Sequence, residues 1–184
     1  MDNKKLLVIS DTHGSISALK AILSWANERT PPNDSICAAA FLGDGIEDIN
    51  PAANAAGFMC SWVIVKGNND YRVQEQDSAL FDFVNYRFFA CHGHRYNLYG
   101  GAHALAAAAK NMGANAVLSG HSHVPYHKII DGIHLINPGS ASRPRSSIGA
   151  TFAVIECAEG EQLKAEFYSI EDKGQIRSVK LHKD

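Results

Sequence analysis

The sequence LLVISDTHG at residues 6–14 decides how the rest of the chain is interpreted. Its short apolar run with β-branched residues predicts a buried strand, which ends at Asp11 and His13 before a helical pattern begins. In an extended conformation, residues i and i+2 point to the same side, so we expect this carboxylate and this imidazole to converge. Open α/β sheets bind ligands beyond the carboxyl ends of their strands. An oxygen and a nitrogen donor at that place suggest a divalent metal.

Length and composition favour one globular domain over residues 1–184. Of the 184 residues, 46% are hydrophobic and 20% are charged, which allows a sizeable core. The net charge of -2, without a long run of Lys or Arg, gives no signal for nucleic-acid binding. No apolar run approaches the roughly 20 residues of a membrane helix, and no apolar signal segment precedes the first strand. We therefore expect a cytoplasmic protein.

Cysteine and histidine are distributed very differently. The four cysteines are scattered singly without a CxxC spacing, so we expect reduced, buried thiols rather than a zinc site: Cys37, Cys60, Cys91 and Cys157. Most of the nine histidines lie between His92 and His134. This clustering points to metal binding, since imidazole is the commonest metal ligand.

The first half of the chain predicts a βαβαβ unit. A helix with Ser15 as its N-cap follows the first strand. Apolar runs predict strands at 36–42 and 61–65, with a short helix at 49–57 between them. Right-handed crossovers place the loops after such parallel strands on one edge of the sheet. The polar residues expected on this edge are Asp11, His13, Asp44 and Asn68.

The second half predicts mainly strands. They are expected at 79–84, 87–91, 116–118, 126–130, 133–136, 151–157 and 162–168, with one helix at 102–111. A tight connection is expected at Asn85-Tyr86, and Asp131-Gly132 predicts a type I′ hairpin. The polar tail from Glu171 is expected to be loosely held.

Seven strand-end residues follow the order D-x-H, G-D, G-N, H and G-H-x-H: Asp11, His13, Asp44, Asn68, His92, His121 and His123. This order resembles the calcineurin-like metallophosphoesterase superfamily. It is most similar to the small prokaryotic phosphodiesterases related to a retromer scaffold subunit, whose G-N-x-D, H-G-H and N-P-G-S motifs occur here at 67–70, 92–94 and 137–140. The resemblance implies an α/β fold, a two-sheet β-sandwich flanked by helices in four αββα layers.

The resemblance also implies two divalent metal ions, with Asp44 as the bridging ligand. Metal one would take Asp11, His13, Asp44 and His123, and metal two would take Asp44, Asn68, His92 and His121. A mixed oxygen and imidazole shell suits transition metals, with Mn²⁺ the common family choice and Fe, Zn, Co or Ni as alternatives. Two such ions acidify a bridging water and clamp the phosphoryl oxygens. The implied reaction is in-line attack by a metal-bridging hydroxide on a small phosphodiester.

The leaving-group acid is the main departure from the family pattern. Many members have histidine where this chain has Asn69 at the catalytic position, and an amide cannot act as a general acid. His94 is our candidate for a substitute proton donor or phosphate contact. Arg143 and Arg145 are either substrate-binding residues, since guanidinium suits phosphate oxygens, or solvated loop residues.

Other interpretations stay open. A non-catalytic scaffold of the same fold is the main alternative, and a monophosphatase or nuclease is a third; a homo-oligomer is also open. Asp70 is expected to order its loop rather than take part in chemistry. Tyr96 and Tyr99 are either substrate-facing or part of a small satellite core. Four further histidines are expected to be ordinary: His103, His127, His134 and His182.

Overall fold

Two mixed β-sheets lie face to face in the computed structural model, which describes residues 3–29, 36–96 and 101–181. The six-stranded sheet has the order β11 (Ile176–Val179), β10 (Lys164–Ile170), β9 (Ala150–Cys157), β1 (Lys4–Ile9), β2 (Ile36–Phe41) and β3 (Ser61–Ile64). The five-stranded sheet has the order β4 (Ser78–Phe83), β5 (Tyr86–Cys91), β6 (Ala116–Ser119), β8 (Ile133–Asn137) and β7 (Tyr126–Ile130). The expected two-sheet architecture is confirmed.

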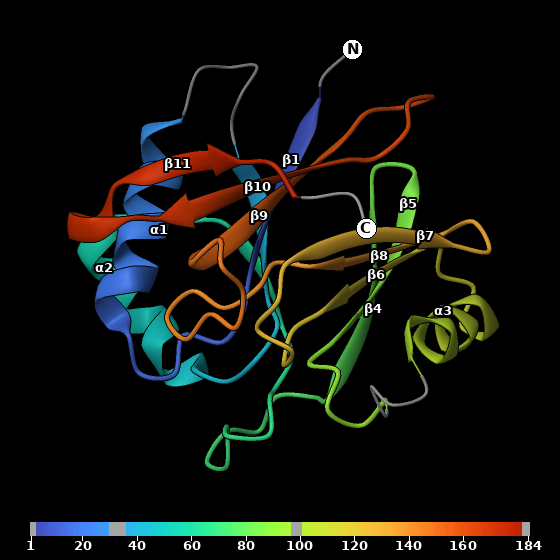
Figure 1. Cartoon of the computed structure of the whole chain (residues 1–184), viewed down its shortest axis with the longest axis horizontal. Helices are drawn as coiled ribbons and strands as arrows, with labels where there is room; N and C mark the ends of the chain where they lie inside the picture. Colours follow the sequence, from blue (N-terminus) through green and yellow to red (C-terminus); the bar gives the residue numbers. More distant parts are fainter. Residues whose placement is uncertain (1–2, 30–35, 97–100, 182–184) are drawn as a thin grey trace.

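Helices cover the outer faces of both sheets (Figure 1). On the six-stranded sheet lie α1 (Ile16–Glu28), which begins at the Ser15 cap, and α2 (Ile49–Ala56). On the five-stranded sheet lies α3 (Gly101–Asn111). The layers are therefore helix, sheet, sheet and helix, as the resemblance implied.

Strand β1 is buried on both of its faces. Leu7 and Ile9 pack toward α1 and α2, whereas Leu6 and Val8 pack into the core between the two sheets. Because side chains alternate along a strand, one continuous apolar run supplies two separate cores. The apolar run that opened the sequence thus becomes the strand at the centre of the fold.

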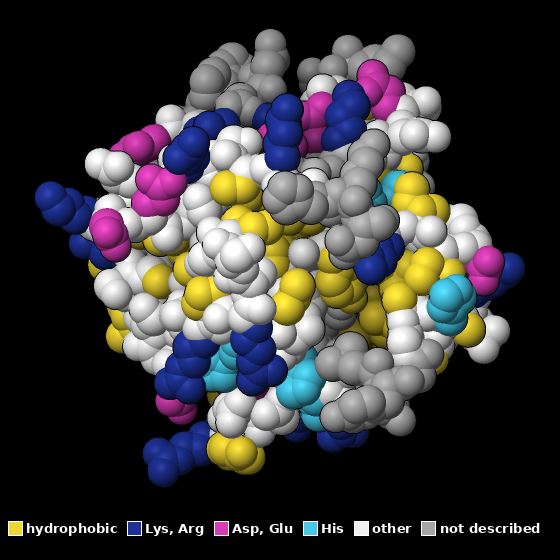
Figure 2. Space-filling model, viewed as in Figure 1, with side chains coloured by type: hydrophobic (Ala, Val, Ile, Leu, Met, Phe, Trp, Pro, Cys, Tyr) yellow, Lys and Arg dark blue, Asp and Glu magenta, His cyan; other side chains and the backbone are white. Residues whose placement is uncertain are grey.

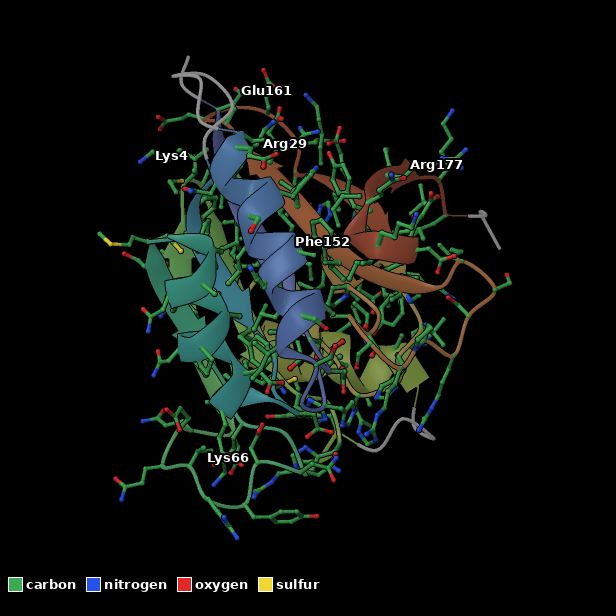
Figure 3. All side chains as sticks on the ribbon, turned by 90° about the vertical axis from the view of Figure 1, so that its left-hand side faces the viewer. Lys4, Arg29, Lys66, Phe152, Glu161 and Arg177 are labelled. Atoms are coloured by element: carbon green, nitrogen blue, oxygen red, sulfur yellow. The ribbon has the colours of Figure 1, made fainter. Side chains whose placement is uncertain are left out.

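The parallel strands direct their carboxyl ends to one end of the molecule. Strand β2 pairs in parallel with both β1 and β3, and β6 pairs in parallel with β5. Figure 3 shows Lys4, at the start of β1, and Lys66, just after β3, at opposite ends of the molecule. All five loops that carry the predicted metal ligands follow these strands.

Two local expectations were wrong. The tail beyond Glu171 is not loose, because β11 pairs with β10 and Ile176 packs against the core beside α1. Strand β11 has only four residues, with polar residues at its centre, and is therefore too short to show the alternation of apolar and polar residues that predicts a strand. The β4–β5 turn lies at Val84-Asn85 rather than one residue later, with Val84 at φ 57°.

The cysteines fit the expectation only in part. All four are free thiols, and Cys91 and Cys157 are buried, which raises the pKa of each to about 12. Cys37 is exposed and Cys60 is half-buried, against expectation. Cys37 lies at an irregularity in the pairing of β1 with β2, and its thiol donates to the Lys5 carbonyl at 3.4 Å. Within the described ranges, no helix has the length and apolar character needed to span a membrane.

A pair of stacked histidines lies away from the predicted ligands. His127 Nε2 and His134 Nδ1 are 3.0 Å apart, and the two rings stack with centroids 5.2 Å apart. One ring must donate and the other accept, so the contact requires at least one neutral imidazole. Burial lowers the pKa of both groups, and for His127 the neighbouring His134 lowers it further.

This pair should make stability depend on pH. Because the folded-state pKa values are lowered, the unfolded chain binds more protons as pH falls through about 6.5, so the unfolding free energy should fall there. Each extra proton contributes at most about 1.4 kcal/mol per pH unit. Replacing His127→Gln should make this slope shallower in denaturant titrations between pH 5 and 8. The exposed His103→Gln on α3 is the control, and equal slopes in both variants would contradict the prediction.

Candidate metal centre

The seven predicted ligands lie at the edge where the strand ends of both sheets meet. They come from the loops after β1, β2, β3, β5 and β6, in the order Asp11 and His13, Asp44, Asn68, His92, and His121 and His123. A cavity of about 440 Å³ opens here, and Arg143 and Arg145 line it together with several of these residues. Figure 2 shows His side chains beside Lys or Arg side chains at the lower part of the molecule.

The ligands do not converge in the way that strand geometry suggested. Asp11 and His13 have φ values of 57° and 46°, and Asp44, His121 and His123 also have positive φ. The expectation of an extended i, i+2 pair was therefore wrong, because β1 already ends at Ile9. Residues other than glycine rarely adopt this conformation, and such strain is concentrated at functional sites.

One group of ligand atoms surrounds Asp11 Oδ1. His123 Nε2 lies 3.1 Å from it and His13 Nε2 lies 3.6 Å from it, while the two imidazole nitrogens are 3.2 Å apart. Three donor atoms at these separations are close enough to bind a single cation. These are three of the four residues expected at metal one.

A second group contains Asp11, Asp44 and His92. Asp44 Oδ2 lies 3.5 Å from His92 Nε2 and 3.8 Å from His13 Nε2, so it stands between one imidazole from each expected ligand set. The ring of His121 is 5.1 Å from that of His92. His121 and Asn68 line the same cavity, although neither belongs to the two compact groups.

The donor atoms fit a metal because several are buried without another partner. Asp11 Oδ1, Asn68 Oδ1 and His92 Nε2 make no hydrogen bond within the described part of the chain. The far nitrogens of two imidazoles are occupied: His92 Nδ1 donates to the Leu42 carbonyl and His123 Nδ1 donates to the Arg143 carbonyl, both at 2.6 Å. Metal-binding histidines commonly use their second nitrogen in this way, which directs Nε2 toward the ion.

The electrostatics of the cluster are dominated by burial and by close charges. Contacts with Asp11 raise the pKa of His123. For His92, burial opposes protonation, yet Asp44 and Asp11 together raise its pKa. Burial also disfavours the charged form of Asp44, but the nearby His92 ring and the hydrogen bonds from Asn69 hold its pKa well below the usual range. Burial lowers the pKa of His13 and of His121, which favours neutral rings able to bind a metal.

The calcineurin-like phosphoesterase superfamily domain is the family whose sequence profile matches residues 5–160. The chain belongs to this superfamily. A protein named as a probable metallophosphoesterase from Mycoplasma pneumoniae is 33% identical over 145 residues, which cover 77% of this chain and 82% of that relative.

Two solved structures of lower identity share the fold. Vps29 from Entamoeba histolytica, crystallised with zinc, has a TM-score of 0.71 at 21% identity over 95% of this chain and 97% of that one. A structure described as a novel archaeal phosphodiesterase has a TM-score of 0.66 at 19% identity over 88% of this chain and 98% of that one. At such identities the likeness concerns the fold alone.

Asp70 organises the loops of this phosphoesterase domain through four backbone N–H groups. Its Oδ1 accepts from Gly45 at 2.9 Å and Ile46 at 3.1 Å, and its Oδ2 accepts from Asp44 at 2.7 Å and Gly67 at 2.8 Å. The carboxylate therefore ties the loop after β2 to the loop after β3. This geometry agrees with the expected loop-ordering role.

Sequence reasoning missed a second supporting carboxylate, Asp48. It is buried, and its Oδ2 accepts from Thr12 Oγ1 at 2.6 Å and from the Gly14 N–H at 2.9 Å. These bonds hold the turn that contains His13. Asp48 lies in a 3₁₀ turn (Ile46–Asp48) close behind the Gly43-Asp44-Gly45 motif, and only that proximity could have marked it.

The N-P-G-S turn supports the site from the opposite side. Asn137 Nδ2 donates to the Gly120 carbonyl at 2.7 Å, which fixes the loop that carries His121 and His123. Ser140 Oγ donates to the Asp11 carbonyl at 2.7 Å. Ser142 Oγ donates to the Thr12 carbonyl at the same distance. The motif found in the sequence is therefore a backbone support for two ligand loops.

Gly67 shows why a loop of this centre requires glycine. A Cβ atom at this position would overlap the Asp44 carboxylate and lie 2.6 Å from the Asp44 nitrogen. Any side chain would therefore push the central carboxylate out of place.

Asn69 and His94 occupy different surroundings. Asn69 contacts the predicted bridging carboxylate directly, since its Nδ2 donates to Asp44 Oδ2 at 2.5 Å and its backbone N–H donates to Oδ1 at 2.8 Å. The His94 ring lies 5.5 Å from the ring of His92 and 6.2 Å from that of His121. Its Nδ1 is buried without a hydrogen-bond partner within the described ranges.

Tyr96 packs edge-on against Phe89 at 5.4 Å in the satellite core beneath α3, and it also lines a hollow with His92 and His94. Tyr99 and His182 lie outside the described ranges.

Replacing Asp70→Asn should loosen the centre without removing a ligand. An amide offers one acceptor oxygen and places an NH₂ group against two backbone donors, so buried N–H groups lose their partner. We expect the unfolding free energy to fall by about 1–3 kcal/mol and Mn²⁺ affinity to weaken. Denaturant unfolding and metal titration measure the two effects. The exposed Asp82→Asn on β4 is the control, and indistinguishable behaviour of the two variants would contradict the prediction.

Proposed function

We propose that this protein is a dinuclear metal-dependent phosphodiesterase acting on small substrates. The observation that carries the proposal is the set of buried donor atoms without partners in a ligand cluster whose cavity is lined by two arginines. Bound there, two divalent ions would supply a nucleophile from water at neutral pH and neutralise charge on the phosphoryl oxygens. Mn²⁺ is the proposed metal, since imidazole and carboxylate donors together suit transition metals better than Ca²⁺.

The arginines are proposed to bind the phosphoryl group. Arg143 and Arg145 are both exposed at the cavity, so their guanidinium groups are free to turn toward an anion. Their loop is well anchored: the Arg145 N–H donates to the His123 carbonyl at 3.0 Å and the Arg143 N–H donates to Ser140 Oγ at 2.8 Å. A fixed backbone beneath mobile side chains positions two cations next to the reacting phosphorus.

We propose that Asn69 and His94 together replace the histidine that many family members have at the position of Asn69. Asn69 orients Asp44 through its two hydrogen bonds and holds no proton to give. His94 is near His92 and His121 without contacting the Asp44 carboxylate, and burial lowers its pKa. A lowered pKa makes the protonated imidazole a stronger acid, which suits His94 to donate a proton to the leaving oxygen.

A diester is favoured over a monoester by the space around the cavity. A second hollow of about 350 Å³ adjoins the first and shares His13, Asp44, Asn69 and Arg143 with it. A phosphodiester has two ester groups to place, and two adjoining hollows offer a place for each. The fold shared with an archaeal phosphodiesterase is in keeping with this assignment.

A scaffold role is the second candidate, because Vps29 has the same fold and was crystallised with zinc. Metal binding alone therefore does not establish catalysis. The proposal also includes a cytoplasmic location, since all four cysteines are free thiols. Small phosphodiesters are proposed as the substrates rather than long nucleic acids.

Hydrolysis of methyl 4-nitrophenyl phosphate should require added Mn²⁺ and Asp44. The Asp44→Asn variant should lower kcat/KM by more than about 100-fold, because metal assistance contributes several kcal/mol to transition-state stabilisation. Release of 4-nitrophenolate measures turnover, and metal analysis counts bound ions. Asp82→Asn is the matched control. A wild-type protein that binds two Mn²⁺ ions yet shows no turnover would favour the scaffold.

Replacing His94→Ala should slow turnover without loss of metal. If His94 donates the proton, the effect should grow as the leaving group becomes more basic and reach about 100-fold for the poorest leaving groups. A series of aryl methyl phosphates measures this dependence, with the exposed His103→Ala as control. An unchanged dependence on leaving-group pKa would remove the proton-donor role.

A further inference from the structure

The hollow beside the metal centre has a wall that the proposed chemistry does not use. Tyr71, Arg72 and Val73 from the loop after β3 line it, opposite Glu47. The hollow adjoins the metal cavity, because both are lined by His13, Asp44, Asn69 and Arg143. A group attached to a phosphoryl centre in the first cavity would therefore lie next to the second hollow.

Tyr71 is unusual among the residues of this wall because its aromatic side chain is exposed on a fixed backbone. It is 84% exposed, although the backbone on both sides is fixed. Before it, Asp70 is held by four backbone N–H groups, and after it Val73 packs against the core beneath α1 and α2. The ring is thus presented to solvent from an anchored loop. A pre-positioned aromatic ring loses little conformational freedom when a ligand covers it.

The charged groups of the hollow favour an anionic or neutral ligand over a cationic one. Within the described ranges, neither Arg72 nor Arg143 takes part in an ion pair, and both are exposed. Four carboxylates line the hollow. Asp44 belongs to the candidate metal centre, and Asp48 and Asp70 are already satisfied by hydrogen bonds. Glu47 is the remaining carboxylate that faces the two guanidinium groups in this described hollow. A planar ring on Tyr71 therefore lies beside positive charge.

We propose that this second hollow is a subsite for one ester group of the substrate, and that it selects a planar aromatic group that stacks on Tyr71. The inference rests on the proposed function, since the phosphoryl group is placed by the metal centre and the arginines. It narrows the substrate class to phosphodiesters with an aromatic ring on one side. Tyr71 acts as a specificity-determining residue and takes no part in bond cleavage.

Two non-hydrolysable probes separate recognition of the ring from recognition of the phosphoryl group. Phenylphosphonate and methylphosphonate carry the same anionic head and differ only in the attached group. Calorimetric titration of the Mn²⁺-loaded protein should show tighter binding of phenylphosphonate, and Tyr71→Ala should weaken that binding about fivefold, the size of one aromatic contact. Methylphosphonate binding should change less than about twofold. Tyr71→Phe should keep the preference for the phenyl compound.

The control variant is Met59→Ala, which removes another exposed apolar side chain, 92% exposed, at the other end of β3. A phenyl preference that survives Tyr71→Ala, or its absence from the wild type, would overturn the subsite. Turnover of methyl 4-nitrophenyl phosphate is measured on the same preparations. If the protein shows no turnover but still prefers the phenyl compound through Tyr71, the subsite is supported and the proposed hydrolase activity is refuted. Failure of the subsite can therefore be distinguished from failure of the proposed function.

Discussion

The metal centre depends on contact between strand ends that belong to different sheets. His92, at the end of β5, donates to the Leu42 carbonyl just beyond β2, and the His121 N–H donates to Asp11 Oδ2 at 3.0 Å. Both bonds cross from the five-stranded sheet to the six-stranded one. Each therefore uses a ligand residue to fix the relative position of the two halves of the site. If the sheets shifted by one residue, the donor atoms around Asp11 Oδ1 would separate.

Holding these groups together works against stability. Asp11 and Asp44 are two buried carboxylates with ligand atoms in one small cluster, and five of the seven ligand residues have positive φ. Such features persist only where the surrounding structure over-determines them. Here Asp48 and Asp70 bind the backbone of the ligand loops, and Asn137 and Ser140 do so from the other side. A bound cation would remove the remaining repulsion, so we expect the fold and the metal to stabilise each other.

The sequence predicted every strand except β11 and the types of residue at the strand ends, but not the local geometry. The apolar run of β1 and the order of the polar motifs predicted which residues would meet, because parallel strands end at one edge. The sequence did not predict the positive φ angles of Asp11 and His13. Their backbone N–H groups donate to the carbonyls of Gly43 and Asp44, so the neighbouring loop helps to impose this conformation. Asp48 and the exposed Tyr71 carry no motif. Their positions depend on tertiary contacts, which the periodicity of hydrophobic residues in one sequence does not reveal.

The shared fold does not choose between an enzyme and a scaffold, because Vps29 and an archaeal phosphodiesterase both have it. Function has to be argued from side chains at the strand ends. A scaffold has no need for buried donor atoms without partners, which reduce stability unless a ligand satisfies them. Nor does it need two arginines anchored by their backbone beside those atoms. Both features are explained if an anion is held beside cations in this cavity, which is the arrangement that the proposed hydrolysis of a phosphoester needs.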